Sequence, residues 1–244
     1  MGTDPALPPL QGGWREESFR VGGQPLRMWV PADPDTLLDD PAVRARNVAE
    51  DYMPYWAWVW PSSPPMAELV RRAGWLRGTE ALELGSGLGM VGVAAGLAGL
   101  QVTFSDHDEM AVGIARRNAA LNGLAGCEGL VLDWRGMAGA PDRKWPVILA
   151  CDVIYEEGSH QPLLDALHRF MDPDGEAWIA DPGRTRAPAF CSAAEEQGLD
   201  VEIRDEEGRV CPGDDRSRPA LVPNEFRLLV LRHGDRGPRR DPAG

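Results

Sequence analysis

Residues 83–92 read ELGSGLGMVG, and this stretch decides the fold class. It follows the apolar run TEALEL at residues 79–84, which predicts a strand, and it leads into MVGVAAGLAGL at residues 90–100, which predicts a helix. Three glycines, Gly85, Gly87 and Gly89, therefore fall in a strand-to-helix turn, where missing side chains let a ligand approach the backbone. The stretch predicts an α/β fold with a binding site at the end of a strand.

The alternation of strands and helices continues toward the carboxyl terminus. Further strands are predicted at residues 101–105, 129–133, 147–152 and 176–181, and further helices begin at Ser62 or Ser63 and span 108–122, 159–171 and 187–199. Such a pattern of near-continuous apolar strands is typical of a parallel sheet covered on both faces. The last two predicted strands, residues 200–205 and 225–233, have no helix between them and should pair antiparallel. We expect a Rossmann-like, doubly wound seven-stranded sheet with a C-terminal antiparallel hairpin.

The first 61 residues follow a different pattern. Residues 1–15 are rich in Pro and Gly and are expected to be disordered, whereas residues 16–61 are expected to form a small N-terminal β-hairpin and an aromatic lead-in. Inside residues 16–61, a polar connection at residues 31–51 is expected to hold one helical turn. The alternating Trp56, Trp58 and Trp60 predict one face of a strand. The main domain is expected at residues 62–233, before a disordered tail at residues 234–244.

Bulk composition narrows the class of protein. A chain of 244 residues suffices for one large α/β domain, and it shows neither a signal peptide nor an apolar run of membrane-spanning length, so a cytoplasmic location is expected. The four cysteines, Cys127, Cys151, Cys191 and Cys211, form no C-x-x-C pair, which argues against a zinc site or a disulfide framework, and no metal is expected. A net charge of −13 disfavours nucleic acid and membranes and favours a cationic substrate such as a lysine-bearing protein.

The glycine loop matches two ligand patterns. Gly87, Gly89 and Gly92 satisfy G-x-G-x-x-G, the dinucleotide fingerprint, whereas Glu83 and the glycines at 85, 87 and 89 satisfy E-x-G-x-G-x-G, which indicates S-adenosylmethionine (SAM). A dinucleotide site needs a second nucleotide-binding half, and this chain closes with a hairpin instead. The loop alone leaves both ligands open.

Residues at two strand ends favour an adenosine. Asp106 ends the strand after the loop, where its carboxylate can accept hydrogen bonds from the ribose hydroxyls of either ligand. Asp133 and Trp134 close the following strand, where an acidic group can accept the adenine amino hydrogens while the indole covers the ring. The alternative for Trp134 is an ordinary, partly buried loop aromatic.

The motif order ELGSGLG, SDHD, LDWR and ACDVIYEE resembles the class I, seven-strand SAM-dependent methyltransferases. Within that class, PYWAWVWPSS at residues 54–63, the D-x-x-Y tetrad at residues 152–155 and IADPGR at residues 179–184 resemble one branch of the protein lysine methyltransferases. This branch includes the electron-transfer flavoprotein β-subunit lysine methyltransferase and the valosin-containing-protein lysine methyltransferase. DPGR in particular is similar to the flavoprotein-directed member. The resemblance covers roughly residues 50–185.

The resemblance implies a SAM site built from the strand ends and the aromatic lead-in. Its implied contacts are Glu83, Gly85, Ser86, Gly87 and Gly89 to the methionine part, Asp106 with its neighbour His107 to the ribose, Asp133 and Trp134 around the adenine, Cys151 on the wall, and Trp60 closing the pocket. Trp56 and Trp58 would shape the substrate entrance. One departure is Cys151, because relatives often carry alanine there.

Asp152 and Tyr155 are the predicted catalytic residues. The Asp152 carboxylate would orient an amine and stabilise the cationic product, and Tyr155 would offer a ring face or a hydroxyl. Capping and packing are the structural alternatives, while Asp181 and Arg184 fit either a structural turn or a wall of the substrate cleft. We expect a monomeric SAM-dependent N-methyltransferase acting on a protein lysine. The alternatives are transfer to a small molecule and a non-catalytic SAM-binding or partner-binding role.

Overall fold

The computed structural model of this chain describes residues 7–211 and 225–234. The expected disorder at residues 1–6 and 235–244 lies outside these ranges, but residues 7–15, also expected to be disordered, are placed. Strand β1 (Trp14–Val21) already begins at Trp14. Its indole donates a hydrogen bond to the Pro8 carbonyl at 2.8 Å and packs 6.3 Å from the Trp56 ring. A single large aromatic thus anchors a segment whose Pro and Gly content suggested disorder.

The central sheet has seven strands in the order β5-β4-β3-β6-β7-β9-β8. Their bounds are β3 Glu80–Leu84, β4 Gln101–Asp106, β5 Glu128–Val131, β6 Trp145–Cys151, β7 Met171–Asp181, β8 Leu199–Arg204 and β9 Arg227–His233. The first five are parallel, and β9 runs antiparallel to both β7 and β8. The predicted fold class is confirmed. Because β9 is inserted between β7 and β8, the sheet differs from the 3-2-1-4-5-6 order of dinucleotide-binding folds.

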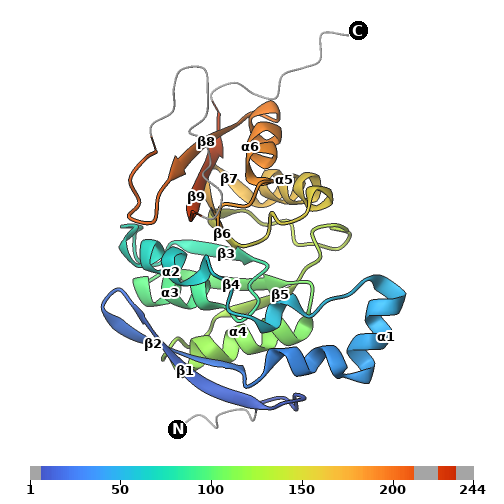
Figure 1. The fold of residues 1–244 in the computed structure, drawn as a ribbon. Helices are drawn as coiled ribbons and strands as arrows, with labels where there is room; N and C mark the ends of the chain where they lie inside the picture. Colours follow the sequence, from blue (N-terminus) through green and yellow to red (C-terminus); the bar gives the residue numbers. More distant parts are fainter. Residues whose placement is uncertain (1–6, 212–224, 235–244) are drawn as a thin grey trace.

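Helices cover both faces of this sheet (Figure 1). One face packs against α2 (Ser63–Arg72), α3 (Met90–Ala98) and α4 (Glu109–Leu121), and the other packs against α5 (His160–Phe170) and α6 (Ala187–Glu196). Strand β6 serves both cores, since Val147 and Leu149 belong to the first and Ile148 and Ala150 to the second. Among the described helices, none is long and apolar enough to cross a bilayer.

The N-terminal hairpin of β1 and β2 (Gln24–Pro31) lies beside α4 (Figure 1). Two asparagines one turn apart on α4 bind the backbone of β2. Asn118 accepts a hydrogen bond from the Trp29 N–H at 2.7 Å and donates to the Trp29 carbonyl at 3.1 Å. Asn122 accepts from the Arg27 N–H at 2.9 Å and donates to the Arg27 carbonyl at 2.6 Å. The helix therefore provides β2 with the hydrogen bonds that a neighbouring strand would otherwise supply.

The polar connection holds more helix than the single turn expected from its sequence. A 3-10 helix, η1 (Pro34–Asp39), precedes the ten-residue α1 (Pro41–Glu50). The Asp40 carboxylate caps α1 by accepting from the Ala42 N–H at 2.7 Å, and Pro41 occupies its first turn. These start signals were present in the sequence, but α1 buries none of its residues, so no apolar stripe revealed it.

The predicted strand through the tryptophan cluster is wrong. Only a 3-10 turn, η2 (Tyr55–Ala57), forms there, and the residues from Trp58 to Pro61 lie outside any helix or strand. Pro54 and Pro61 bracket the segment, and its N–H groups bond locally, as from Ala57 to the Pro54 carbonyl at 3.0 Å. The alternation therefore does not place the three indoles on one face.

Candidate functional site

A cavity of about 360 Å³ opens at the carboxyl ends of the parallel strands. It lies where the strand order reverses between β3 and β6, the crevice in which open α/β folds bind ligands. Every residue predicted for the site borders it: Trp60, Glu83, Gly85, Ser86, Gly87, Gly89, Asp106, His107, Asp133, Trp134, Cys151, Asp152 and Tyr155. The fold thus brings together residues from five segments of the chain, and their individual roles remain predictions.

The glycine loop turns sharply between β3 and α3. Gly85, Gly87 and Gly89 have φ angles of 65°, 49° and 82°, in the left-handed region that favours glycine. A Cβ on Gly85 would lie 3.0 Å from both the Trp134 ring and a Val153 methyl group. Gly92 is different, because a Cβ there would collide with Glu83 and lie 2.5 Å from Phe104. Gly92 serves helix-to-sheet packing under either ligand pattern and does not discriminate between them.

Glu83 presents a buried carboxylate to the cavity. The residue is 3% exposed, and its Oε2 has no hydrogen-bond partner among the described residues. Burial raises the pKa of Glu83 to about 8, the backbone N–H of Gly92 opposes this shift, and the nearby Asp106 carboxylate adds to it. Buried polar atoms are nearly always paired, so this oxygen, which lies against Gly92 of α3, is a candidate acceptor for a ligand donor.

Asp106 ties β4 to the glycine loop. Its Oδ2 accepts a hydrogen bond from the Gly87 N–H at 3.0 Å, and its Oδ1 accepts from the Asp108 N–H at 3.0 Å. His107 Nδ1 lies 3.2 Å from Oδ1. The hydrogen bond to Asp106 raises the pKa of His107 above its usual value, although burial opposes the shift. The carboxylate is thus held rigidly on the cavity wall.

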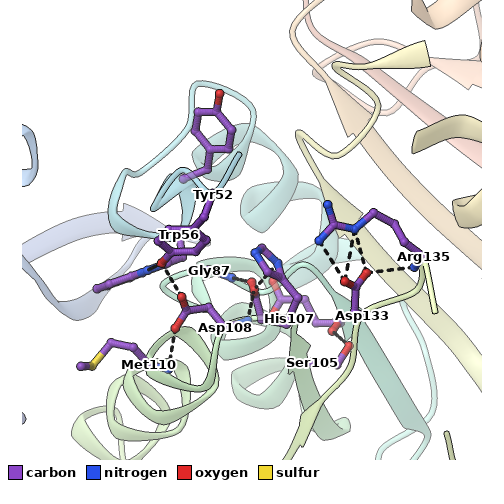
Figure 2. A network of polar contacts seen from close by, with 12 residues as sticks. Tyr52, Trp56, Gly87, Ser105, His107, Asp108, Met110, Asp133 and Arg135 are labelled. Atoms are coloured by element: carbon purple, nitrogen blue, oxygen red, sulfur yellow. Dashed lines mark hydrogen bonds and ion pairs between the residues drawn. The ribbon is translucent and has the colours of Figure 1, made fainter. Parts of the chain in front are cut away.

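A second network, next to Asp106, centres on Asp108 (Figure 2). Asp108 caps α4 by accepting a hydrogen bond from the Met110 N–H at 2.9 Å. Its other oxygen accepts from the Tyr52 hydroxyl, and Trp56 Nε1 donates to that hydroxyl at 3.2 Å. Arg46 on α1 also lies 3.4 Å from this oxygen. The network joins α1 and the tryptophan segment to the cavity wall.

Asp133 is already engaged by a residue that the sequence did not single out. The Arg135 guanidinium binds both of its oxygens, at 2.9 Å through Nε and 2.9 Å through Nη2, and holds the pKa of Asp133 below its usual value (Figure 2). An adenine amino group would therefore have to share the Asp133 oxygens with Arg135. Trp134 remains beside Gly85 at the edge of the cavity.

Asp152 also has partners within the protein. Its side chain is 2% exposed, Arg184 Nη1 lies 2.6 Å from Oδ1 as an ion pair, and the Ser62 N–H donates to Oδ2 at 3.1 Å. The residue has a φ of 60°, an uncommon conformation that Asp tolerates better than most residues and that occurs often at functional sites. The carboxylate borders the cavity but is not an unpaired base.

Arg184 belongs to a tight turn after β7. Asp181, which is fully buried, accepts from the N–H groups of Gly183 and Arg184 at 2.8 and 2.6 Å through Oδ1. Its Oδ2 lies 3.0 Å from Arg184 Nη1. Both interpretations of DPGR therefore apply, because Asp181 builds the turn and Arg184 borders the cavity.

Aromatic rings line the mouth of the cavity. Tyr55 packs edge-on against Tyr155 at 5.5 Å and against Trp60 at 6.0 Å, and Trp58 lies 6.4 Å from Trp60. Tyr55 and Tyr155 are 39% and 37% exposed, so ring surface remains open to a partner. This cluster can contact an alkyl chain or a cation.

Several residues that border the cavity were not predicted from the sequence, and Arg184 was not predicted as the ion-pair partner of Asp152. The others are Tyr55, Ser63, Arg135, Val153, Glu156 and Ser159. Most directly neighbour a predicted residue, so adjacency was the one available signal. The pairing of Arg184 with Asp152 crosses from one strand end to another and has no local sequence signal.

Comparisons with known proteins agree with this geometry. The family described as lysine methyltransferase matches residues 59–195. The electron transfer flavoprotein beta subunit lysine methyltransferase of Danio rerio is 33% identical over 140 residues, which make up 54% of this chain and 52% of that protein. The chain thus matches only about half the length of this curated relative.

Solved structures share the fold. The ribosomal protein L11 methylase of Lactobacillus delbrueckii subsp. bulgaricus superposes with a TM-score of 0.55 at 19% identity, covering 72% of this chain and 81% of that one. The glycopeptide N-methyltransferase MtfA complexed with SAM superposes with a TM-score of 0.54 at 13% identity, covering 70% and 94%.

Proposed function

The chain belongs to the lysine methyltransferase family, and we propose that it is a SAM-dependent enzyme that methylates a lysine side chain of a protein. The observation that carries this proposal is the buried, unpartnered Glu83 oxygen beside the glycine loop. SAM carries an α-ammonium group that can donate to such an oxygen. A dinucleotide site also needs a second nucleotide-binding half, whereas the described part of this chain closes its sheet with the antiparallel strands β9 and β8.

The remaining cofactor residues fit the other parts of the same molecule. Asp106, fixed by Gly87 and Asp108, offers a carboxylate edge to the ribose hydroxyls, and Trp134 offers a ring face to the adenine. Because Arg135 holds Asp133, we assign Asp133 the role of positioning Arg135 and Trp134 at this end of the cavity. When bound, SAM supplies a methyl group on a sulfonium, and the protein's task is to position and desolvate the acceptor amine.

The mouth of the cavity supports a lysine as the acceptor. Tyr55, Trp58, Trp60 and Tyr155 surround the opening with rings that suit an alkyl chain ending in an amine. The net charge of −13 favours a cationic protein partner. The relative from Danio rerio is named for the electron transfer flavoprotein beta subunit, so that subunit is the first candidate substrate.

We further propose that residues 62–233 form the methyltransferase domain and that residues 16–61 form an extension around its substrate entrance. We also propose a cytoplasmic enzyme that works as a monomer. A reducing compartment is supported by the four cysteines, all in the described part of the chain, because no disulfide joins them.

Methyl-labelled SAM tests the proposal directly. The protein is incubated with label and extract from source cells that lack its gene, and the products are desalted and hydrolysed. The proposal predicts label in the protein fraction as ε-N-methyllysine and none with an Asp106→Ala control, which disturbs the cofactor loop. Label confined to small molecules would contradict the protein substrate, and tight S-adenosylhomocysteine binding without transfer would indicate a non-catalytic role.

A further inference from the structure

Resting on this function, we propose that Arg184 is a positioning residue that neutralises the Asp152 carboxylate, so that the site receives the substrate lysine as a neutral amine. The D-x-x-Y pattern alone suggests that Asp152 meets the amine as a free carboxylate. In the structure, Arg184 Nη1 lies 2.6 Å from Asp152 Oδ1 as an ion pair, and the Ser62 N–H donates a hydrogen bond to Oδ2 at 3.1 Å.

The turn that carries Arg184 is built to hold this contact. Asp181 is 0% exposed and fixes the backbone N–H groups of Gly183 and Arg184 through one oxygen, while its other oxygen lies 3.0 Å from the guanidinium. Burial disfavours the charge of Arg184, but Asp152 and Asp181 outweigh that penalty and hold the pKa of Arg184 above its usual value. The guanidinium therefore stays charged and stays between the ends of β6 and β7.

Of the carboxylates around the cavity, Asp152 is the one whose pairing with an arginine affects the substrate amine. Each of the other charged groups is paired, screened by water or on the cofactor side. These groups are Glu83, Asp106, His107, Asp133, Arg135 and Glu156. Asp133 is paired with Arg135, and Asp106 accepts two backbone N–H groups and contacts His107. Glu83 lies at the glycine loop, on the cofactor side. Glu156 follows Tyr155 and is exposed, so water screens its charge.

The chemistry explains why a free carboxylate would hinder the reaction. The amine lone pair forms the new N–C bond while the C–S bond breaks and its electron pair remains on sulfur. The lysine ammonium must first release a proton to water to expose that lone pair, and the methylated ammonium product later does the same. An unpaired carboxylate nearby would stabilise the ammonium and raise the lysine pKa by about one to three units. Arg184, which Asp152 shares with Asp181, reduces this effect.

The first test measures amine binding without turnover. n-Butylamine serves as a probe of the lysine side chain and is titrated calorimetrically into the S-adenosylhomocysteine complex at about pH 7.5, where its ammonium form dominates. Arg184→Met should bind the probe about tenfold or more tightly than the wild type, since Asp152 is then unpaired. Arg184→Met with Asp152→Asn should return to the wild-type affinity. The matched control is Arg186→Met, which removes a nearby arginine that pairs with the exposed Glu157 instead.

The second test is the pH profile of methyl transfer to the gene-deleted extract. Arg184→Met should move the rising limb to higher pH by about one unit or more and approach the wild-type rate at alkaline pH. Arg184→Lys should restore most of the wild-type midpoint. Equal loss at every pH with unchanged n-butylamine affinity would overturn the proposal and leave Arg184 a purely structural residue.

Two further measurements keep the test decisive. S-Adenosylhomocysteine affinity reports whether Arg184→Met is folded. If Arg184→Met is not folded, Asp152→Asn alone should weaken n-butylamine binding by removing one of the two carboxylates that Arg184 contacts, and unchanged or tighter binding would overturn the inference. A wild-type protein that transfers no methyl group to protein contradicts the proposed function, while the binding arm still decides the role of Arg184.

Discussion

Glu83 makes a prediction at the scale of one residue. In the free protein the pKa of the Glu83 carboxyl is about 8, so the group is mostly protonated below that pH. A ligand ammonium group requires the ionised Glu83 carboxylate as its partner. S-Adenosylhomocysteine should therefore bind more tightly as pH rises, by at most about tenfold per unit, and level off above the pKa. Below that pKa, binding should release a proton to the buffer.

Glu83→Gln should weaken this binding and remove its pH dependence between about pH 6 and 8. Calorimetry in buffers of different ionisation enthalpy measures both affinity and proton release. Glu157→Gln is the matched control, because the Glu157 side chain is 70% exposed and pairs only with Arg186 among the ion pairs of the described residues. A wild-type affinity that stays flat across this range would show that Glu83 does not receive the ammonium.

Individual site residues were predictable where the chemistry depends on a position at a strand end. Asp106 ends β4, Trp134 and Asp152 follow β5 and β6, and parallel strands bring their carboxyl ends to one edge. Their partners were not predictable. The ion pairs of Asp133 with Arg135 and of Asp152 with Arg184 depend on how loops fold over that edge, which no local pattern encodes.

At the scale of elements, the asparagines of α4 predict how the N-terminal hairpin is held. Asn118 is fully buried and bonds to both backbone groups of Trp29 and to the Leu88 carbonyl at 2.9 Å. Asn118→Ala would leave these groups unpaired and should destabilise the protein by about 2–3 kcal/mol. The half-buried Asn122 makes the equivalent bonds to Arg27, so Asn122→Ala should cost about 1 kcal/mol or less.

Urea denaturation of both variants measures this difference. Limited proteolysis should also release the hairpin more readily in Asn118→Ala than in Asn122→Ala. Equal destabilisation by the two substitutions would mean that burial of Asn118 adds nothing, and it would contradict this account of hairpin docking.

Elements were predictable from the sequence where apolar periodicity reports burial. Strands β3, β4 and β6 and helices α3 to α6 lie where that pattern placed them, within a few residues. Apolar periodicity was misleading where a helix buries none of its residues, or where alternating apolar residues do not belong to a strand. Helix α1 buries no residue and shows no stripe, whereas the tryptophan cluster alternates in sequence without a partner strand.

At the scale of the whole molecule, the strand order is the feature that the sequence left open. The chain pattern indicated that β8 and β9 pair antiparallel, but either could have bordered β7. The structure places β9 there through a register from Glu176–Arg232 to Asp181–Arg227. Long-range pairing of this kind depends on packing against the finished sheet, and local propensity does not determine it.

The acidity of the molecule makes a prediction about substrate encounter. Because this protein carries a net charge of −13, it should attract a lysine-rich protein substrate over long range. Raising salt from about 0.05 to about 0.3 M should increase KM several-fold and leave kcat nearly unchanged, because screening weakens association and not chemistry. Steady-state methylation assays at several salt concentrations measure this. A KM that is independent of salt would remove the electrostatic argument for a cationic protein partner.

The proposed function requires that this enzyme transfer a methyl group to a protein lysine in the cell. Quantitative mass spectrometry of lysine methylation in source cells with and without the gene tests this most directly. The account predicts that at least one methyllysine disappears on deletion and returns with the wild-type gene, but not with Asp106→Ala. An unchanged set of methylated lysines, together with a missing small-molecule methyl product, would contradict it.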